Sequence, residues 1–301
     1  MNIELAQDGP SISSIVLGVM KWGAWGHQMS PEAMRSLVEE SMEMGVSTFD
    51  HADIYGHYTT EAEFGNALKH HAHLRQRMQI VTKCGIRLVT PNRPEHRLKS
   101  YDTDAAYIRR SVEQSLRNLG TDYIDLLLIH RPDPLMNPDE VAHIFRELQQ
   151  EGKVLHFGAS NFSPSQFDML HDRIPLVTNQ VQASAMFLEP FLDGTFDQSL
   201  RLRLRPMAWA PLGGSRFFTD LEDPKVYRLR EVLKTISVEK GGVPEDQLML
   251  AFLLRHPAGI VPVIGTSNAA RVRSAVAALG ISLTREEWFS IWSASTGAEV
   301  P

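Results

Sequence analysis

The sequence predicts an α/β protein of the (β/α)8 or TIM-barrel class, with residues 1–301 forming a single domain. Short, near-continuous apolar stretches alternate with helical stretches, as in a parallel sheet that is buried on both faces. Eight such units follow one another, which favours a closed barrel. The alternative is an open doubly wound sheet, but no G-x-G-x-x-G sequence follows any predicted strand. No low-complexity linker divides the chain, and the proline-containing segment 91–97 is predicted to be a loop insertion.

The individual elements are predicted from apolar runs and helix-start signals. After a hairpin-like start broken at Asp8-Gly9-Pro10, residues 15–20 form the first buried strand. Ser30-Pro31 begins a helix with serine as N-cap and proline at the first helical position, and Gly45 ends it. Further strands are predicted at 46–50, 79–83, 124–129, 153–158, 176–180, 205–210 and 260–264. Helices are predicted at about 61–70, 104–119 and 138–150, after Ser163-Pro164, near 190–200, and twice between 222 and 255.

Composition limits the possible partners and compartment. The net charge of −6 is spread without a basic block, so neither nucleic acid nor a membrane surface is an expected partner. A single cysteine, Cys84, excludes an intramolecular disulfide, and Met1-Asn2-Ile3-Glu4 lacks the features of a secretory signal. Apolar runs such as Ile124–Ile129 are far shorter than the ~20 residues of a transmembrane helix. We therefore expect a cytoplasmic protein.

Four polar residues follow three consecutive predicted strands. Asp50 ends one strand, and Tyr55 comes five residues later in a polar, glycine-containing loop. Lys83 ends the next strand and His130 the one after it. In a barrel these strand ends meet at one face, where an acid, a phenol and a cation suit proton transfer if the cation lowers the tyrosine pKa. Taken singly, each residue also has a structural explanation, as a helix cap, a surface charge or a hydrogen-bonded strand-end histidine.

The pattern D-x4-Y, followed by a lysine at one strand end and a histidine at the next, resembles the catalytic tetrad of the aldo-keto reductase superfamily. The resemblance covers nearly the whole chain. It implies a barrel that transfers hydride from NADPH to an aldehyde or ketone, a small-molecule carbonyl substrate. Tyr55 would be the general acid, Lys83 and Asp50 would support it, and His130 would hydrogen-bond the substrate oxygen.

Three further segments resemble cofactor-binding motifs of this superfamily. Gly158-Ala159-Ser160-Asn161-Phe162 and Thr178-Asn179-Gln180 are similar to its G-x-S-N-F and N-Q segments, which implies that Ser160, Asn161 and Gln180 contact the nicotinamide carboxamide. The segment Met207–Gly213 resembles A-Y-S-P-L-G. It implies that Trp209 stacks on the nicotinamide and adds Pro211, Leu212 and Gly213 to the cofactor site. Val261–Arg273 resembles the phosphate-binding segment and implies phosphate contacts from Gly265, Thr266, Ser267, Asn268 and Arg271.

Some positions depart from the family pattern or stay undecided. Ser274 and Ala275 stand where the family often has Glu-Asn, and His51 stands where a threonine is common. Trp22, Trp25 and Tyr58 are expected at the mouth of the substrate pocket, with core packing as the alternative.

No metal site is predicted. His70, His71 and His73 are interpreted as a solvated helix end, because no further ligand group follows at metal spacing. The lone Cys84 is interpreted as a small core residue.

Two other functions stay open at this point. An NADPH-binding regulatory or sensor subunit with little turnover would keep the same motifs. A lyase that uses Lys83 to form a Schiff base would keep only the lysine, so the tetrad makes it the weaker hypothesis. A panel of carbonyl compounds assayed with NADPH separates an enzyme from a sensor.

Overall fold

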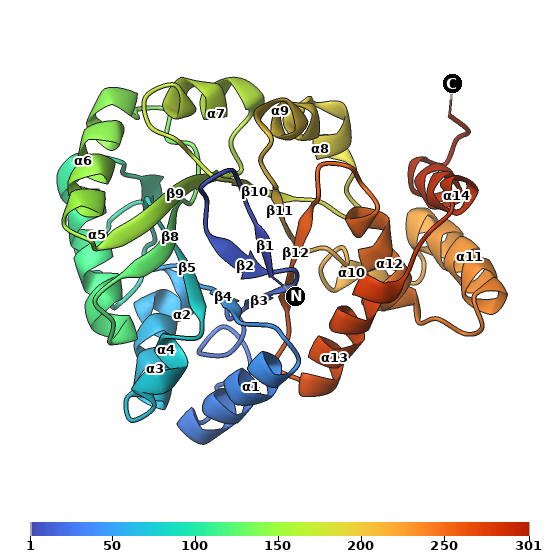
Figure 1. The fold of residues 1–301 in the computed structure, drawn as a ribbon, viewed down its shortest axis with the longest axis horizontal. Helices are drawn as coiled ribbons and strands as arrows, with labels where there is room; N and C mark the ends of the chain where they lie inside the picture. Colours follow the sequence, from blue (N-terminus) through green and yellow to red (C-terminus); the bar gives the residue numbers. More distant parts are fainter. Residues whose placement is uncertain (1, 301) are drawn as a thin grey trace.

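The computed structural model describes residues 2–300 and confirms a closed barrel of eight parallel strands (Figure 1). Around the barrel the strands run β3, β4, β5, β8, β9, β10, β11 and β12, and β12 pairs with β3 to close it. Their bounds are β3 (Val16–Gly18), β4 (Thr48–Asp50), β5 (Gln79–Cys84), β8 (Ile124–Ile129), β9 (Val154–Ser160), β10 (Asn179–Gln182), β11 (Met207–Trp209) and β12 (Val261–Gly265). Each overlaps a predicted strand.

Helices surround the barrel, and most of them start at the predicted signals. Ser30 Oγ accepts a hydrogen bond from the Ala33 amide at 3.2 Å and thereby caps the first helix. The longer helices are α1 (Pro31–Glu43), α3 (Thr60–Leu68), α5 (Ala105–Leu119), α6 (Pro138–Gln150), α7 (Pro164–His171), α9 (Thr195–Leu202), α11 (Pro224–Glu239), α12 (Glu245–Leu254), α13 (Ala269–Ala277) and α14 (Arg285–Thr296). Short turns are α2 (Tyr55–Tyr58), α4 (Ala72–Arg75), α8 (Glu189–Leu192), α10 (Arg216–Thr219) and the 3-10 turn Ala278–Gly280.

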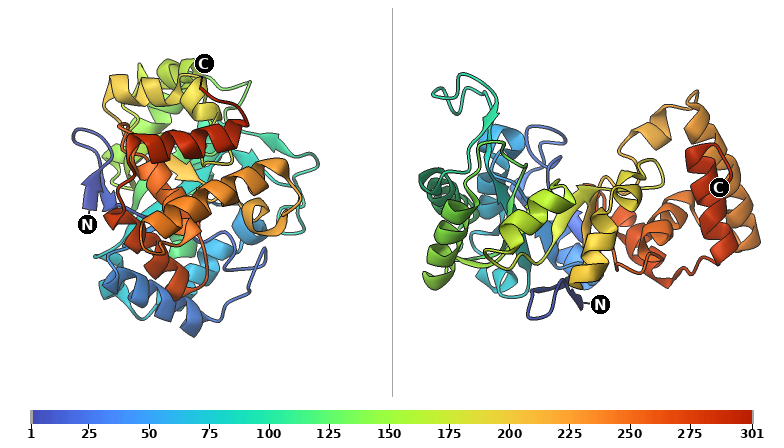
Figure 2. Two further views of the ribbon diagram at one scale, coloured as in Figure 1. Left: turned by 90° about the vertical axis from the view of Figure 1, so that its right-hand side faces the viewer. Right: turned by 90° about the horizontal axis from the view of Figure 1, so that it is seen from above.

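Helix α14 was not predicted. It begins with a capping box formed by Thr284 and Glu287, a signal that is present in the sequence. It packs with α11 beside the barrel, as the two views of Figure 2 show. No helix within residues 2–300 is long and apolar enough to cross a membrane.

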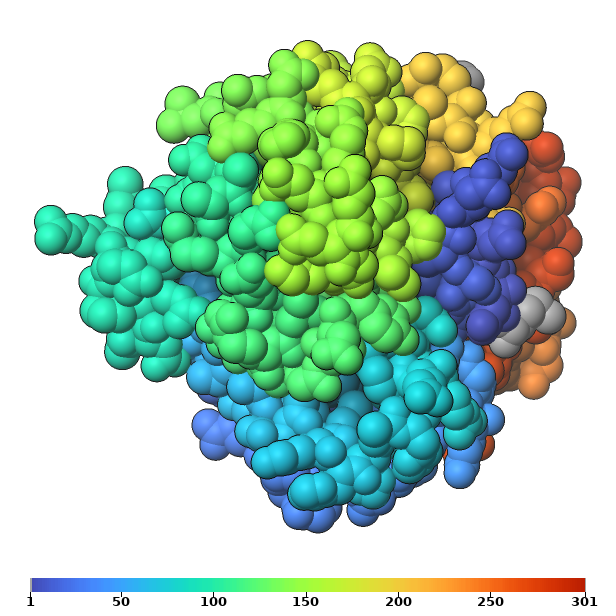
Figure 3. Space-filling model, turned by 60° about the vertical axis from the view of Figure 1, so that its left-hand side comes forward, coloured from blue at the N-terminus to red at the C-terminus, as the bar shows by residue number. Residues whose placement is uncertain are grey.

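Two antiparallel ribbons extend the barrel. The first joins β1 (Asn2–Glu4) to β2 (Ser11–Ser13) near the N-terminus, as predicted for a hairpin-like start. The second joins β6 (Ile86–Arg87) to β7 (Ser100–Tyr101). The segment 88–99 between β6 and β7 contains the predicted loop insertion and projects from the molecule at the left of Figure 3.

The barrel interior changes from apolar to polar along its axis. Apolar side chains such as Val81, Leu126 and Met207 form one buried cluster, which also draws on the β1–β2 ribbon. Because side chains alternate along a strand, Lys83 points to the same interior as Val81, two residues further along β5. The interior is therefore filled below by apolar contacts and carries charge at the C-terminal ends of the strands.

Candidate active site

The structure places the four tetrad residues together at the C-terminal ends of β4, β5 and β8. Lys83 Nζ donates hydrogen bonds to Asp50 Oδ2 at 2.7 Å, to the His51 carbonyl at 2.7 Å and to Tyr55 Oη at 3.3 Å. Lys83 is 1% exposed and Asp50 3% exposed, so the ion pair is withdrawn from water. An ammonium with three oxygen partners is fully satisfied and directs one hydrogen bond at the phenol.

The charge on Lys83 is maintained by its neighbours. Burial disfavours the ammonium, but the nearby Asp50 and Tyr55 outweigh it, so the pKa of Lys83 lies above its ordinary value. The other carboxylate oxygen, Asp50 Oδ1, accepts a hydrogen bond from Gln180 Nε2 at 2.8 Å. Asp50 is thus held between the lysine and a residue of β10.

The pKa of Tyr55 differs from the sequence-based expectation. Lys83 lowers it, as expected, but burial of the phenol raises it by more, and the net pKa lies above the ordinary value. The expectation of a net decrease was wrong because the sequence shows the cation but not the depth at which the ring is buried. The raised pKa keeps the proton on the hydroxyl at neutral pH, while Lys83 stabilises the phenolate once the proton has left.

His130 lies across the site from Tyr55, with 6.2 Å between the ring centroids. Its backbone amide donates to the Cys84 carbonyl at 2.8 Å, which fixes the end of β8 against β5. Burial of the ring, and then the charges of Lys83 and Arg131, lower the pKa of His130 well below its ordinary value. The imidazole is therefore neutral at neutral pH. Its Nδ1 has no hydrogen-bond partner within residues 2–300.

The loop that carries Tyr55 has three consecutive residues with left-handed backbone conformation. Gly56, His57 and Tyr58 have φ of 60°, 60° and 71°, in the left-handed region. A Cβ at Gly56 would approach Thr60 Oγ1 to 2.4 Å, so glycine is required there. Thr59 Oγ1 donates to the Gly56 carbonyl at 2.8 Å. This local turn fixes the chain next to the tyrosine that the tetrad requires.

A hydrogen-bonded chain joins the expected nicotinamide positions on β9, β10 and β11. Trp209 Nε1 donates to Asn161 Oδ1 at 2.9 Å, and Asn161 Nδ2 donates to Ser160 Oγ at 2.8 Å. Ser160 Oγ donates to the Gln180 carbonyl at 2.9 Å. Since the Gln180 side chain reaches Asp50, the chain connects these positions to the tetrad.

The segment after Trp209 makes a tight turn. Ala210 and Gly213 have positive φ, and a Cβ on Gly213 would lie 2.5 Å from Met186 Cγ. Pro211 is buried, and Leu212 packs between two of the hydrophobic clusters. The turn therefore places backbone close to the mouth of the barrel.

The expected phosphate-binding segment forms the end of β12 and the start of α13. Thr266 Oγ1 accepts a hydrogen bond from the Asn268 amide at 3.1 Å, and Asn268 caps α13 by accepting from the Ala270 amide at 2.8 Å. Ser267 lies between them, and Gly265 is exposed with nothing within 4 Å of a Cβ placed on it. Arg271 is exposed on the first turn of the helix. A helix N-terminus beside an arginine suits an anion.

The expected substrate-pocket residues divide into three environments. Trp25 is half-buried, with its ring 6.0 Å from that of Tyr55, which is consistent with the pocket mouth. Trp22 is not at the mouth: it is 0% exposed, packs near Phe64 and donates from Nε1 to the Thr266 carbonyl at 2.8 Å. Its role is to support the segment after β12.

Tyr58 also lies elsewhere. Its Oη donates to the Ile86 carbonyl at 3.2 Å and accepts from the Leu88 amide at 2.9 Å, and its side chain lines a separate cavity outside the barrel. Both corrections have one physical reason, namely that an aromatic residue near a strand end can point inward or outward and tertiary packing decides which.

Two residues near the tetrad were not predicted to act there. Arg131 is half-buried, its guanidinium lies 5.8 Å from the Trp209 ring centroid, and its charge lowers the pKa values of Tyr55 and His130. The signal for it was its place directly after His130 at a strand end. His51 was noted only as a departure from the family pattern. It is fully buried against Phe64, and burial, together with Lys83, lowers its pKa to about 3.

Comparison with known proteins identifies the family to which the chain belongs. Residues 14–295 match the model of the aldo/keto reductase family. The chain is 48% identical over 301 residues to the oxidoreductase YdhF of Escherichia coli, covering 99% of each chain. It is 40% identical over 295 residues to a 6-dehydroglucose reductase of Agrobacterium fabrum, covering 97% of each.

Among solved structures, the aldo-keto reductase AKR11C1 of Bacillus halodurans, in its holo form, superposes with a TM-score of 0.82 at 26% identity. The match covers 99% of this chain and 97% of that one. The chain therefore belongs to the aldo/keto reductase family and is an oxidoreductase with that family's (β/α)8 barrel.

Proposed function

We propose that this protein reduces aldehyde or ketone carbonyls to alcohols with NADPH, and that Tyr55 is the general acid. The observation that carries the proposal is the placement of Lys83 Nζ between Asp50 Oδ2 and Tyr55 Oη, at 2.7 and 3.3 Å. A neutral phenol next to a buried ammonium whose pKa is raised can release its proton as negative charge develops on a carbonyl oxygen.

The nicotinamide, when bound, supplies the hydride that attacks the carbonyl carbon. The protein's part is to position the substrate and to move the proton. Tyr55 donates the proton to the carbonyl oxygen, and Lys83 stabilises the resulting phenolate. Asp50 keeps Lys83 charged and oriented. His130, neutral because its pKa is lowered, can donate a hydrogen bond to the same oxygen without competing for the proton.

The residues expected at the cofactor carry the kinds of groups that a dinucleotide requires, namely polar side chains, an aromatic ring and backbone amides. Asn161 and Trp209 are half-buried and offer an amide and an aromatic face, Ser160 is buried and bonds to Asn161, and the start of α13 offers backbone amides. The buried Nδ1 of His130 has no hydrogen-bond partner within residues 2–300, which supports a polar ligand at this mouth. Arg271 and the hydroxyl of Ser267 support a preference for the extra phosphate of NADPH.

The substrate is expected to be a small carbonyl compound. The Agrobacterium relative carries the name 6-dehydroglucose reductase, so oxidised sugars belong in the first set to be tried. The half-buried Arg131 beside Trp209 supports a polar substrate, because a guanidinium with no salt-bridge partner in residues 2–300 disfavours a purely apolar neighbour.

A panel of aldehydes, ketones and oxidised sugars, assayed with NADPH and with NADH, tests the proposal. Steady oxidation of NADPH that Tyr55→Phe abolishes would support it. Tight NADPH binding with no turnover on any carbonyl would replace it with the regulatory-subunit hypothesis. The lyase hypothesis predicts that borohydride traps a substrate on Lys83, but a buried lysine with a raised pKa is protonated and a poor nucleophile.

A further inference from the structure

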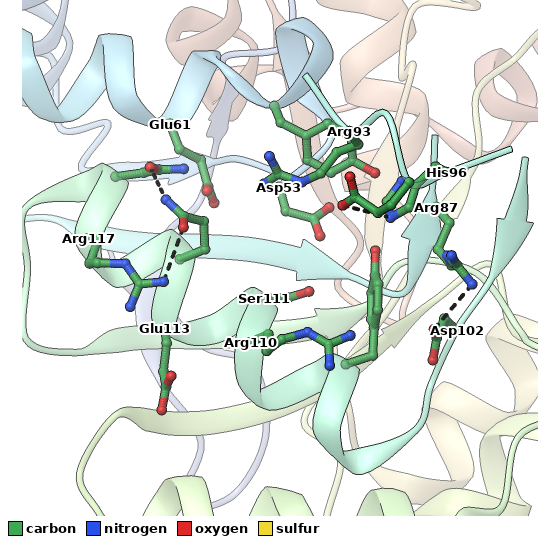
Figure 4. A pocket seen from close by; sticks show the side chains of 15 residues that line it. Asp53, Glu61, Arg87, Arg93, His96, Asp102, Arg110, Ser111, Glu113 and Arg117 are labelled. Atoms are coloured by element: carbon green, nitrogen blue, oxygen red, sulfur yellow. Dashed lines mark hydrogen bonds and ion pairs between the residues drawn. The ribbon is translucent and has the colours of Figure 1, made fainter. Parts of the chain in front are cut away.

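A second cavity lies on the outer side of the barrel wall, between α3, α5 and the β6–β7 ribbon (Figure 4). We call it the α3–α5 cavity. Its volume is about 400 Å³, which lies within the range of small-molecule sites. None of the tetrad residues or the expected cofactor-binding residues lines it. It is therefore distinct from the candidate active site.

A buried carboxylate that makes no salt bridge within residues 2–300 lines this cavity. Asp53 is 8% exposed, and its Oδ1 has no hydrogen-bond partner within the described chain. Glu61, 2% exposed, also lines the cavity and accepts a hydrogen bond from Thr82 Oγ1 at 2.7 Å. Burial, and then the charge of Glu61, raise the pKa of Asp53 well above its ordinary value. Leaving such a group unpaired is costly, and a bound cation would remove the cost.

Guanidinium groups lie nearer the surface of the same cavity. Arg93, half-buried, comes from the segment 88–99, and Arg110, exposed, comes from α5. In residues 2–300 both stack on tyrosine rings, 4.5 Å from the centroid of Tyr58 and 5.7 Å from that of Tyr107, and neither is paired with a carboxylate. Figure 4 shows Asp53 between these two arginines. The cavity thus attracts a cation at its buried wall and an anion at its rim.

We propose that the α3–α5 cavity binds a small zwitterionic amine, such as an amino acid, with its ammonium group at Asp53 and its carboxylate at Arg93 and Arg110. An ammonium carries three donors and can reach the unpartnered Oδ1, while an arginine can hold a carboxylate through two parallel hydrogen bonds. A simple amine would be repelled by the arginines at the rim. A simple carboxylate would leave Asp53 Oδ1 without a partner.

Calorimetric titration of the full-length protein with defined probes tests this proposal. The probes are glycine, 4-aminobutanoate and 6-aminohexanoate, which differ in the separation of their charges, with butylamine and butanoate as single-charge controls. At least one amino acid should bind with a Kd of about 1 mM or tighter, and more tightly than both controls. If none binds in that range, or if butylamine or butanoate binds as tightly as the amino acids, the proposal is wrong. Turnover is not needed for this readout.

Two substitutions separate the two ends of the site. Asp53→Asn should weaken amino-acid binding at least about thirtyfold, the lower range of losses when one partner of a buried charge pair is removed. Arg93→Gln should weaken amino-acid binding but leave butylamine binding unchanged or stronger.

Asp168→Asn removes a surface carboxylate of α7 that pairs with Arg201 and should bind like wild type. Thermal unfolding of each variant verifies that it is folded. If Asp53→Asn does not fold, the loop variant Arg93→Gln still decides the question. Unchanged amino-acid affinity in either cavity variant would overturn the proposal.

Discussion

Replacing Tyr55 by phenylalanine should remove the proposed general acid and little else. The ring and its packing stay, and Lys83 Nζ keeps its bonds to Asp50 and the His51 carbonyl, both at 2.7 Å. Loss of one hydrogen bond should lower the free energy of unfolding by about 0.5–1.5 kcal/mol. The chemical step should slow by about 10²–10⁴-fold. That loss corresponds to about 3–5 kcal/mol in the activation barrier at 1.36 kcal/mol per tenfold.

The assay should isolate the chemical step. The enzyme–NADPH complex is mixed with carbonyl substrate under single-turnover conditions, and the loss of NADPH absorbance gives the rate of the chemical step. A separate equilibrium titration measures the affinity for NADPH, which should stay close to that of wild type. Lys83→Met should cause a similar loss, and the double variant should be little worse than either single one, because both act on one proton. If Tyr55→Phe kept more than about a tenth of the wild-type rate, the proton would have another donor, with His130 the first to be tested.

Tyr107→Phe is a matched control. Tyr107 is 8% exposed against 9% for Tyr55, and its hydroxyl donates to the Ile86 carbonyl at 3.1 Å, outside the barrel. It should lose similar stability and keep the rate of the chemical step. A parallel loss of rate in this control would show that the effect of Tyr55→Phe is general to buried hydroxyls.

Three further predictions concern the cofactor and the buried carboxylate. Arg271→Ala should raise the KM for NADPH much more than that for NADH, whereas Arg273→Ala, exposed on the same helix, should affect neither; equal effects of Arg271→Ala on both cofactors would refute the phosphate assignment. NADPH should quench tryptophan fluorescence, and Trp209→Ala should remove most of the quench and weaken binding by about 1–3 kcal/mol, the cost found when a stacked aromatic is truncated at nucleic-acid sites; an unchanged quench would assign Trp209 to packing alone. Asp53→Asn should stabilise the fold increasingly as the pH rises from about 4 through the raised pKa of Asp53. The reason is that above the ordinary pKa the unfolded chain ionises this group more easily than the native protein does. Chemical unfolding at several pH values measures the difference, and a parallel change in the stability of the two proteins would refute this prediction.

Local sequence signals were sufficient for the barrel and for the meeting of the tetrad. The period-two pattern of Val81 and Lys83 already places the lysine inside the barrel, and three strand ends in succession place Asp50 and His130 beside it. The direction in which a side chain points was harder to predict from the sequence. Trp22 turns outward to Thr266, a residue 244 positions away, and nothing near it in the sequence indicates that contact.

The α3–α5 cavity could not be predicted for the same reason. It depends on Asp53, on Arg93 in a loop insertion and on Arg110 in the next helix, which no shared motif connects. The raised pKa of Tyr55 depends on depth of burial, a property of the assembled fold. The sequence therefore indicated which residues lie in the candidate active site, but it gave less information on how strongly they interact.

The order of the strands along the chain also affects how the cofactor preference of such a protein can evolve. Every tetrad residue precedes the exposed turn at Gly152, and every residue expected at the nicotinamide or phosphate follows it. Hydrogen bonds still join the two groups, from Gln180 Nε2 to Asp50 at 2.8 Å and from Asn161 Nδ2 to the His130 carbonyl at 3.4 Å. Mutations in the later half could thus exchange one dinucleotide for another while the proton donor and its lysine are inherited intact. A hybrid gene that joins residues 1–152 to the corresponding later half of a relative is a natural starting point for altering cofactor use.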